Sequence, residues 1–321
     1  MATSTSDAHE PDGAAPAELI DLLEQGRKQF LALVDHIRPE LHRYCTRMTG
    51  SVADGEDVVQ ETLAKACFEL PQMRTLPPLR PWLFRIAHNR AIDHWRHEAH
   101  RAGESLDAAM DIADESTLEP DQMLARDQAV RAAISCFLKL APAQRGCVIL
   151  KDVLEHSLDE IAAELGLSVA AVKTALHRGR AALQKLNAAA SAPTRHEPSP
   201  ALAHYASLFN GHDWAGVRSL LADDVRLDLV SQRKSAGRRE VGQYFSNYAL
   251  VQDVHLAPAW LDGREVLAVL SGPGAVQPRY FIELGWHEGQ VLTIRDFRYV
   301  PYIACDAAFE LCAPSPDRSP P

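Results

Sequence analysis

The residues best suited to binding a nucleic acid lie close together between Ser157 and Leu183. Cationic side chains attract phosphates, and Arg, Thr and His side chains can also hydrogen-bond to base edges. The candidates are Lys173, Thr174, His177, Arg178 and Arg180. Apolar residues alternate with them at helical spacing, so one face of a helix is expected to be buried and the other basic. This pattern predicts a helix that contacts DNA.

Two short helices must position this basic face. Ser157 and Glu160 form a capping box at the start of the first helix. Gly166 supplies the positive φ of the turn, and Ser168 can cap the second helix. A pair of this kind, with the basic residues on its second member, is typical of a helix-turn-helix. The alternative is an ordinary helical hairpin with a solvated basic face.

A second group of candidates lies upstream, between Pro77 and Arg101, where helical spacing also holds. Trp82, Arg85, Asn89 and Arg96 recur on one face of this expected helix. Rings and guanidinium planes stack on splayed-out bases, and an amide can read a base edge. Histidines at 88, 94, 97 and 100 lie among these arginines, which favours a DNA-facing helix over a metal site.

Three separate motifs resemble the extracytoplasmic-function group of bacterial RNA polymerase sigma factors. They are DVVQETLAKACFEL, which starts at Asp57, PWLFRIAHNRAIDHWR, which starts at Pro81, and SLDEIAAELGLSVAAVKTALHRGRAAL, which starts at Ser157. They occur in the order of that family, and the resemblance covers roughly residues 27 to 187.

The resemblance implies a role for each motif. Asp57, Gln60 and Glu61 would bind core polymerase, whose largest-subunit coiled coil and flap are the expected partners. The −10 promoter element would be recognised by Arg74, Trp82, Arg85, Asn89 and Arg96, with the loop 72–78 as the pocket for a flipped base. The basic face around Arg178 would read the −35 element. Ala175 stands where relatives often carry a basic residue, which implies altered −35 readout.

Composition divides the chain into modules. We expect disordered tails at 1–17 and 309–321, helical modules at 18–101 and 123–187, an acidic linker at 102–122 and a small-residue linker at 188–200. The net charge of −10 is unusual for a DNA-binding protein, but residues 166–195 hold five Lys or Arg and no acid. Because charge acts locally in salt, this basic segment still suits DNA.

Residues 201–308 follow a different pattern. Helices are expected around 202–209, 215–221 and 241–248, a strand at 225–229, and four more strands near 254–261, 264–270, 279–286 and 290–299. FNGHDWAGVRSLLADDVRLDL and VLTIRDFRYVPYI resemble the SnoaL-like branch of the NTF2-like cone fold. The fold class is therefore multidomain, with two all-α modules followed by an α+β NTF2-like cone domain.

The resemblance to that branch, which includes isomerases and cyclases, raises the question of a catalytic pocket. Carboxylates that could abstract a proton are Asp228, Glu283 and Asp296, and aromatic residues that could form walls are Tyr244, Tyr248, Trp260, Tyr280 and Trp286. Alternatively, Asp296 and Arg298 form a structural ion pair and the aromatic residues are core. Since a fold does not confer a function, no enzyme activity is predicted.

Three function classes remain. The first is a sigma factor whose C-terminal domain docks on the sigma core through a small polar interface and modulates activity, with or without a small ligand. The second is a stand-alone helix-turn-helix regulator with a ligand-sensing domain, and the third a SnoaL-type enzyme with an attached DNA-binding module. The motif at Asp57 favours the first.

Six cysteines without metal-type spacing indicate no metal, and no cofactor is predicted. With no long apolar run, we expect a cytoplasmic protein without a membrane contact.

Overall fold

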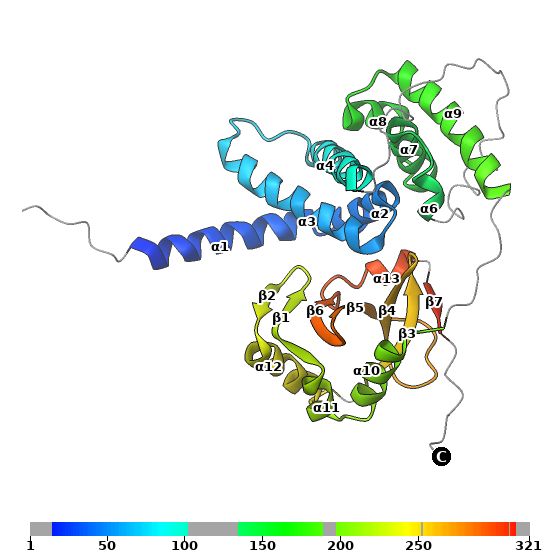
Figure 1. The fold of residues 1–321 in the computed structure, drawn as a ribbon. Helices are drawn as coiled ribbons and strands as arrows, with labels where there is room; N and C mark the ends of the chain where they lie inside the picture. The colour runs from blue at the N-terminus through cyan, green and yellow to red at the C-terminus, as the bar shows by residue number, and fades with distance from the viewer. Residues whose placement is uncertain (1–14, 102–133, 189–196, 252, 308, 313–321) are drawn as a thin grey trace, which may run out of the picture.

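The computed structural model describes residues 15–101, 134–188, 197–251, 253–307 and 309–312. Two helical modules form one half of the molecule, and a domain built around a curved sheet forms the other half (Figure 1). The acidic linker, most of the linker at 188–200 and most of both expected tails lie outside the described residues.

The first module contains α1 (Ala15–Val34), α2 (Arg38–Thr49), α3 (Val52–Glu69), the 3-10 turn η1 (Leu70–Gln72) and α4 (Leu79–Arg101). Gly50, at φ 85°, ends α2, and the Ser51 hydroxyl accepts from the Asp54 amide and begins α3. The expected tail ends earlier than position 17, because α1 already begins at Ala15.

The second module contains α6 (Ile134–Phe137), α7 (Pro142–Val148), the π-helical turn η3 (Ile149–Val153), α8 (Leu158–Leu165) and α9 (Val169–Ala188). The capping box of Ser157 and Glu160 is present, and Gly166 adopts φ 68°. Ser168 accepts a hydrogen bond from the Ala171 amide. The helix-turn-helix prediction for α8 and α9 is confirmed.

The two helical modules share one hydrophobic core. Tyr44 and Phe84 of the first module are buried together with Cys147 and Leu154 of the second. The Arg145 guanidinium, fully buried, donates to the Met48 carbonyl at 2.6 Å and so ties α7 to the end of α2. The two helical modules therefore pack against each other in a closed arrangement.

The sheet domain runs from α10 to β7. Its helices are α10 (Pro200–Asn210), α11 (Trp214–Ser219), α12 (Arg238–Tyr248) and α13 (Ile303–Asp306). Its strands are β1 (Leu221–Leu229), β2 (Arg233–Ala236), β3 (His255–Leu261), β4 (Arg264–Leu270), β5 (Tyr280–His287), β6 (Gln290–Asp296) and β7 (Phe309–Leu311).

The strand order is β2-β1-β6-β5-β4-β3-β7, with β1 parallel to β6 and the other pairs antiparallel. Register shifts in β1 and β5 bend the sheet around α10 and α12. This is the expected NTF2-like α+β cone, and the predicted strands are confirmed. The short strands β2 and β7 were not predicted, and β7 replaces the first residues of the expected C-terminal tail.

Candidate functional sites

The DNA face predicted for the helix-turn-helix lies on α9. Lys173 and Thr174 are exposed, and His177 and Arg178 are half-buried beside them. Arg180 turns back into its own module, where Nη2 and Nε lie 2.5 and 2.9 Å from the two carboxylate oxygens of buried Asp152. The expectation that Arg180 belongs to the exposed basic face is therefore corrected, because a buried carboxylate holds its guanidinium in a two-point ion pair.

The second predicted DNA face lies on α4. Arg85, Asn89 and Arg96 are exposed along it, and Arg74 is exposed in the loop that precedes the helix. Trp82 does not join them, since only 5% of it is exposed and it packs in the shared core. In this arrangement its ring is not available to stack on a base, which corrects the expected surface position.

A groove of about 620 Å³ borders the helix predicted to bind polymerase. Apolar side chains from α1 and α3 form its floor, and Gln60 and Glu61 lie at its rim. Phe68, 73% exposed, extends the apolar surface along α3. The sequence analysis missed both Phe68 and the share that α1 takes. The helical spacing of Phe68 from Gln60 was the available signal for Phe68, whereas the sequence held no such signal for α1.

The sheet domain contacts the first module around Glu56, a carboxylate with no exposed surface. Arg38 donates to Glu56 Oε1 at 2.5 Å, and the Tyr302 hydroxyl donates to Glu56 Oε2 at 2.7 Å. The other end of the Arg38 guanidinium donates to Ser231, in the turn between β1 and β2. The Tyr302 ring also packs edge-on against His42 at 5.3 Å. Both halves of the molecule are needed to satisfy this buried carboxylate.

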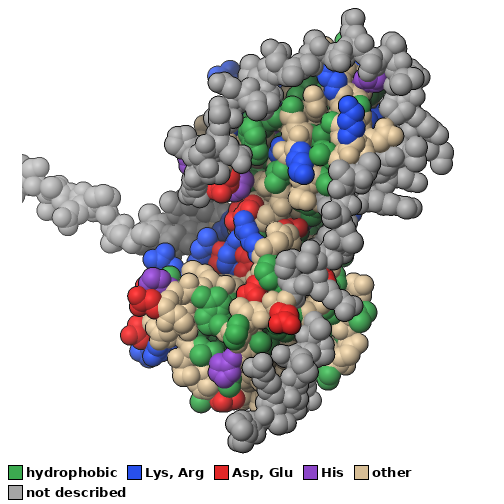
Figure 2. Space-filling view, turned by 45° about the vertical axis from the view of Figure 1, so that its right-hand side comes forward, with side chains coloured by type: hydrophobic (Ala, Val, Ile, Leu, Met, Phe, Trp, Pro, Cys, Tyr) green, Lys and Arg blue, Asp and Glu red, His purple; other side chains and the backbone are tan. Residues whose placement is uncertain are grey.

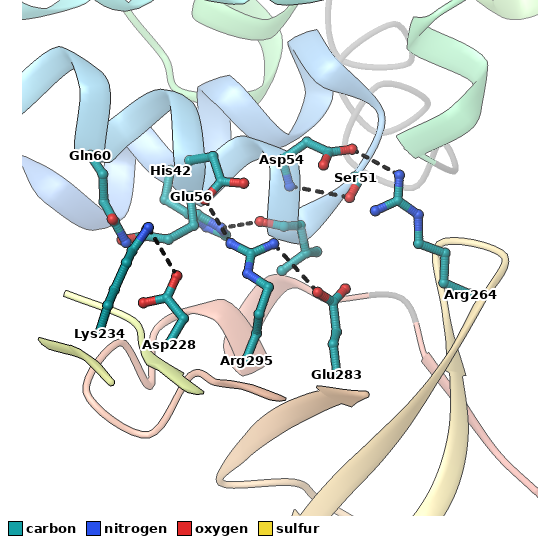
Figure 3. Close-up of polar contacts among 12 residues, drawn as sticks. His42, Ser51, Asp54, Glu56, Gln60, Asp228, Lys234, Arg264, Glu283 and Arg295 are labelled. Atoms are coloured by element: carbon teal, nitrogen blue, oxygen red, sulfur yellow. Dashed lines mark hydrogen bonds and ion pairs between the residues drawn. The ribbon is translucent and has the colours of Figure 1, made fainter. Parts of the chain in front are cut away.

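Asp57, one of the residues predicted to bind polymerase, is paired with the sheet domain. Arg295 of β6 lies 2.6 Å from Asp57. The same guanidinium lies 3.4 Å from Glu283 of β5 (Figure 3). Burial raises the pKa of the Asp57 carboxyl above its ordinary value, although the Arg295 charge opposes this shift. Burial likewise raises the pKa of Glu283. Arg295 therefore bridges two partly desolvated carboxylates.

The turn between β3 and β4 contacts the start of α3. The Val52 amide donates to Asp262 Oδ2 at 2.7 Å. Arg264 lies 3.1 Å from Asp54 (Figure 3). Burial raises the pKa of the Asp262 carboxyl to about 6, against the pull of the Val52 amide and Arg264. The carboxylate acts as an additional cap on α3, supplied by the other half of the chain.

Apolar contacts accompany these charges. Val52 and Ala53, and Ile134 of the second module, are buried in the same cluster as the core of the sheet domain. In Figure 2, side chains of both charge signs gather where the helical half meets the sheet domain. The interface is thus partly apolar, which differs from the expectation of a purely polar contact.

The residues proposed for a pocket in the sheet domain separate into two groups. Tyr244 and Tyr248 each donate to Asp296 Oδ2, at 2.8 and 2.9 Å, and Tyr248 also bonds to Tyr280. Asp296 has no exposed surface, and burial raises its pKa. The expected ion pair of Asp296 with Arg298 takes another form, because the Arg298 amide donates to the carboxylate while its guanidinium lies over the Tyr248 ring.

The other proposed pocket residues lie away from this cluster. Asp228 pairs with Lys234 at 3.5 Å in a groove of about 590 Å³ beside β1, β2 and β6, which Arg295 also lines. Trp260 lies on β3 and Trp286 on β5, both half-buried, and neither lines that groove. The structure thus brings together only the tyrosines and Asp296.

No described helix is long and apolar enough to cross a membrane.

Comparisons with known proteins agree with the three motifs. Residues 33–101 match the model of Sigma-70 region 2, and residues 131–183 match that of Sigma-70 region 4. The chain is 32% identical over 230 residues to the ECF RNA polymerase sigma factor SigG of Mycobacterium tuberculosis, a match that covers 64% of this chain and 60% of SigG. It is 33% identical over 165 residues to ECF sigma factor SigW of Bacillus subtilis, covering 49% of this chain and 87% of SigW.

Solved structures match the two halves. The sigma factor SigJ of Mycobacterium tuberculosis aligns with 83% of this chain and 95% of its own, at 20% identity and a TM-score of 0.34. A putative polyketide cyclase of Pseudomonas putida aligns with 35% of this chain and 99% of its own, at 14% identity and a TM-score of 0.25. On the sequence relationship to SigW and the two region matches, the chain belongs to the extracytoplasmic-function family of RNA polymerase sigma factors.

Proposed function

We propose that the protein is a promoter-specificity subunit that binds core RNA polymerase through α3 and contacts promoter DNA through α4 and α9. The observation that carries this proposal is the groove beside α3, which combines an apolar floor with Gln60 and Glu61 at its rim. A helical partner, such as a coiled coil, fits an apolar groove with polar ends. A stand-alone regulator needs no such surface.

The experiment is binding to purified core polymerase. Replacing Gln60 and Glu61 together with Ala should abolish co-purification, because both side chains line the groove. Gln60 also donates to Glu56 at 3.4 Å, so circular dichroism checks that the double variant stays folded. Glu69→Gln is the matched control, since Glu69 lies on the same helix and pairs with Lys65, also of α3, in a partly exposed contact. Equal binding by the double variant and the control would refute docking at this groove.

The two DNA faces divide the promoter between them in this proposal. Arg85, Asn89 and Arg96 on α4 suit the −10 element, where exposed bases can be stacked and hydrogen-bonded. Lys173, Thr174, His177 and Arg178 on α9 suit the −35 duplex. Arg180 supports this face indirectly, by fixing α9 against Asp152.

We also propose that the sheet domain restrains polymerase binding. Arg295 of the sheet domain forms an ion pair with Asp57, and Ser231 of the same domain lines the groove beside α3. A partner that uses Asp57 must therefore displace Arg295. Because the linker between α9 and α10 is short, the sheet domain stays at a high effective concentration and can return after displacement.

Truncation after Ala190 tests this restraint. The helical half has its own core, so we expect it to remain folded and to bind polymerase more tightly than the full chain. Of the residues expected to form a ligand pocket, Asp228 lines a groove, together with Lys234 and Arg295, and we propose this groove as the place for a small ligand. We assign the cluster around Asp296 to the domain core rather than to catalysis, because the carboxylate is enclosed and has three donors.

A further inference from the structure

A buried histidine joins the two helical modules. His156 precedes α8, and its ring has 1% of its side-chain surface exposed. Nδ1 lies 2.8 Å from Glu164 of its own module, and Nε2 lies 2.9 Å from Glu40 of α2 in the first module. The Phe84 ring of α4 packs edge-on against the imidazole at 5.1 Å. One imidazole thus lies between two carboxylates from different modules.

The charges around this ring come from every element packed against it. Glu164 and Glu160 lie on α8, Glu40 on α2, and Arg80 at the start of α4. Arg80 pairs with the same Glu40 oxygen and lies 2.8 Å from Nε2. Lys151 of η3 donates to the His156 carbonyl at 3.0 Å. The two carboxylates in direct contact favour the imidazolium, and Arg80 opposes it.

The closed arrangement matters for the function proposed above, on which this inference rests. Elements centred near −35 and −10 are about 25 base pairs apart, or roughly 85 Å along B-form DNA. In the structure α8 packs against α4 and α9 packs against α8. At roughly 8–10 Å for each helix-to-helix step, the axes of α4 and α9 are only about 20 Å apart where these contacts meet. The closed form therefore cannot hold both elements, and the modules must separate.

We propose that Glu40, His156 and Glu164 form a proton-dependent latch that holds the two helical modules closed in the free protein. The latch acts together with Arg145, which fastens α7 to the Met48 carbonyl. Opening separates His156 and Glu164, which stay together in the second module, from Glu40 and Arg80 in the first. The imidazolium then loses one of its two carboxylates and gains water.

The direction of the pH dependence follows from this geometry. Burial lowers the pKa of His156, but the hydrogen bonds with Glu164 and Glu40 together raise it by more than burial lowers it, to about 9. The proton therefore stabilises the closed form, fully below the ordinary histidine pKa, and this stabilisation is lost as pH rises through about 9. Because the open form keeps Glu164, the pKa of its His156 lies between the ordinary value and about 9, so the ratio of open to closed protein should rise by up to roughly 20-fold between about pH 7.5 and about pH 9.5.

Energy transfer between two fluorophores measures this ratio in the full-length protein. Labels introduced with non-canonical amino acids at His36 and Gln184, both exposed, report on the first and second modules. We expect wild-type transfer to fall as pH rises over that window. His156→Gln should remove this pH dependence, and Glu40→Gln should raise the open population at least about tenfold at neutral pH.

Glu24→Gln is the matched control, because it removes one carboxylate charge from an exposed pair on α1. Circular dichroism checks that every variant stays folded. If the protein loses its fold at high pH, the comparison of Glu40→Gln with Glu24→Gln at neutral pH decides alone. Unchanged transfer in Glu40→Gln would overturn the latch. Polymerase binding by the same samples separates that result from a failure of the proposed function.

Discussion

The hydroxyl of Tyr302 offers the sharpest test of how the sheet domain is held. Tyr302→Phe removes one oxygen and leaves the ring against His42 and beneath the Arg38 guanidinium. Glu56, which has no exposed surface, then loses the 2.7 Å donor to Oε2 and keeps Arg38 on Oε1. The substitution therefore tests the contacts of this hydroxyl, chiefly its hydrogen bond to Glu56 across the interface.

The magnitude follows from the charge on the acceptor. A hydrogen bond to a charged group contributes roughly 1.5–3 kcal/mol, and the stranded oxygen cannot be solvated without opening the contact. We expect docking of the sheet domain to weaken by about 2 kcal/mol, which is roughly a 30-fold rise in the separated fraction. If the separated form is the one that binds polymerase, its apparent affinity should rise by a comparable factor.

Hydrogen exchange at the Val52 amide is the assay, because this amide donates to Asp262 only while the two halves are together. Tyr299→Phe is the matched control, since Tyr299 is half exposed and follows the same strand. Protection of Val52 should fall in Tyr302→Phe and stay unchanged in Tyr299→Phe. Equal protection and equal polymerase affinity in both variants would show that this hydroxyl does not hold the interface.

Three further predictions concern other contacts. Burial raises the pKa of Asp262 to about 6, so the docked form takes up a proton and docking of the sheet domain should tighten as pH falls through about 6, by at most about tenfold per pH unit. Asp262→Asn should remove this pH dependence, measured as the protection of the Val52 amide from hydrogen exchange. Arg180→Ala should cost about 3 kcal/mol of stability by stranding buried Asp152, whereas exposed Lys173→Ala should leave the thermal midpoint unchanged and weaken DNA binding. Asn89→Ala should bind duplex promoter normally but open it poorly, so normal permanganate reactivity of the −10 bases would contradict its role.

Local structure was largely predictable because its causes lie within a few residues. The capping box at Ser157, the left-handed Gly166 and the strands between 254 and 299 each depend on neighbours in the sequence. The strand β2 was missed because Arg233–Ala236 has no apolar alternation and pairs at the sheet edge only with β1. Nothing local distinguishes such a strand from a turn.

Side-chain direction was harder to predict where a residue suits two environments. Trp82 can stack on a base or fill a core, and the same helical spacing serves both. It lies inward, in the core that the two helical modules share. Arg180 shares a sequence pattern with Arg178 but meets the buried Asp152, a partner 28 residues earlier. Only the tertiary structure, which brings Asp152 of η3 next to Arg180 of α9, decides between phosphate and carboxylate as its partner.

The acidic residues at the start of α3 have partners that could not be predicted from the sequence. The cation of α3, Lys65, pairs with Glu69, so the partners of Asp54, Glu56 and Asp57 come from elsewhere in the chain. The family resemblance supplies one partner, polymerase, and the fold supplies another through Arg264, Tyr302 and Arg295, more than 200 residues away. In the proposed function both partners compete for Asp57, whereas Gln60 donates to Glu56 at 3.4 Å and Glu61 lines the groove beside α3. A docking helix that is only partly covered can be reached by polymerase at its free end, and binding there would then displace Arg295.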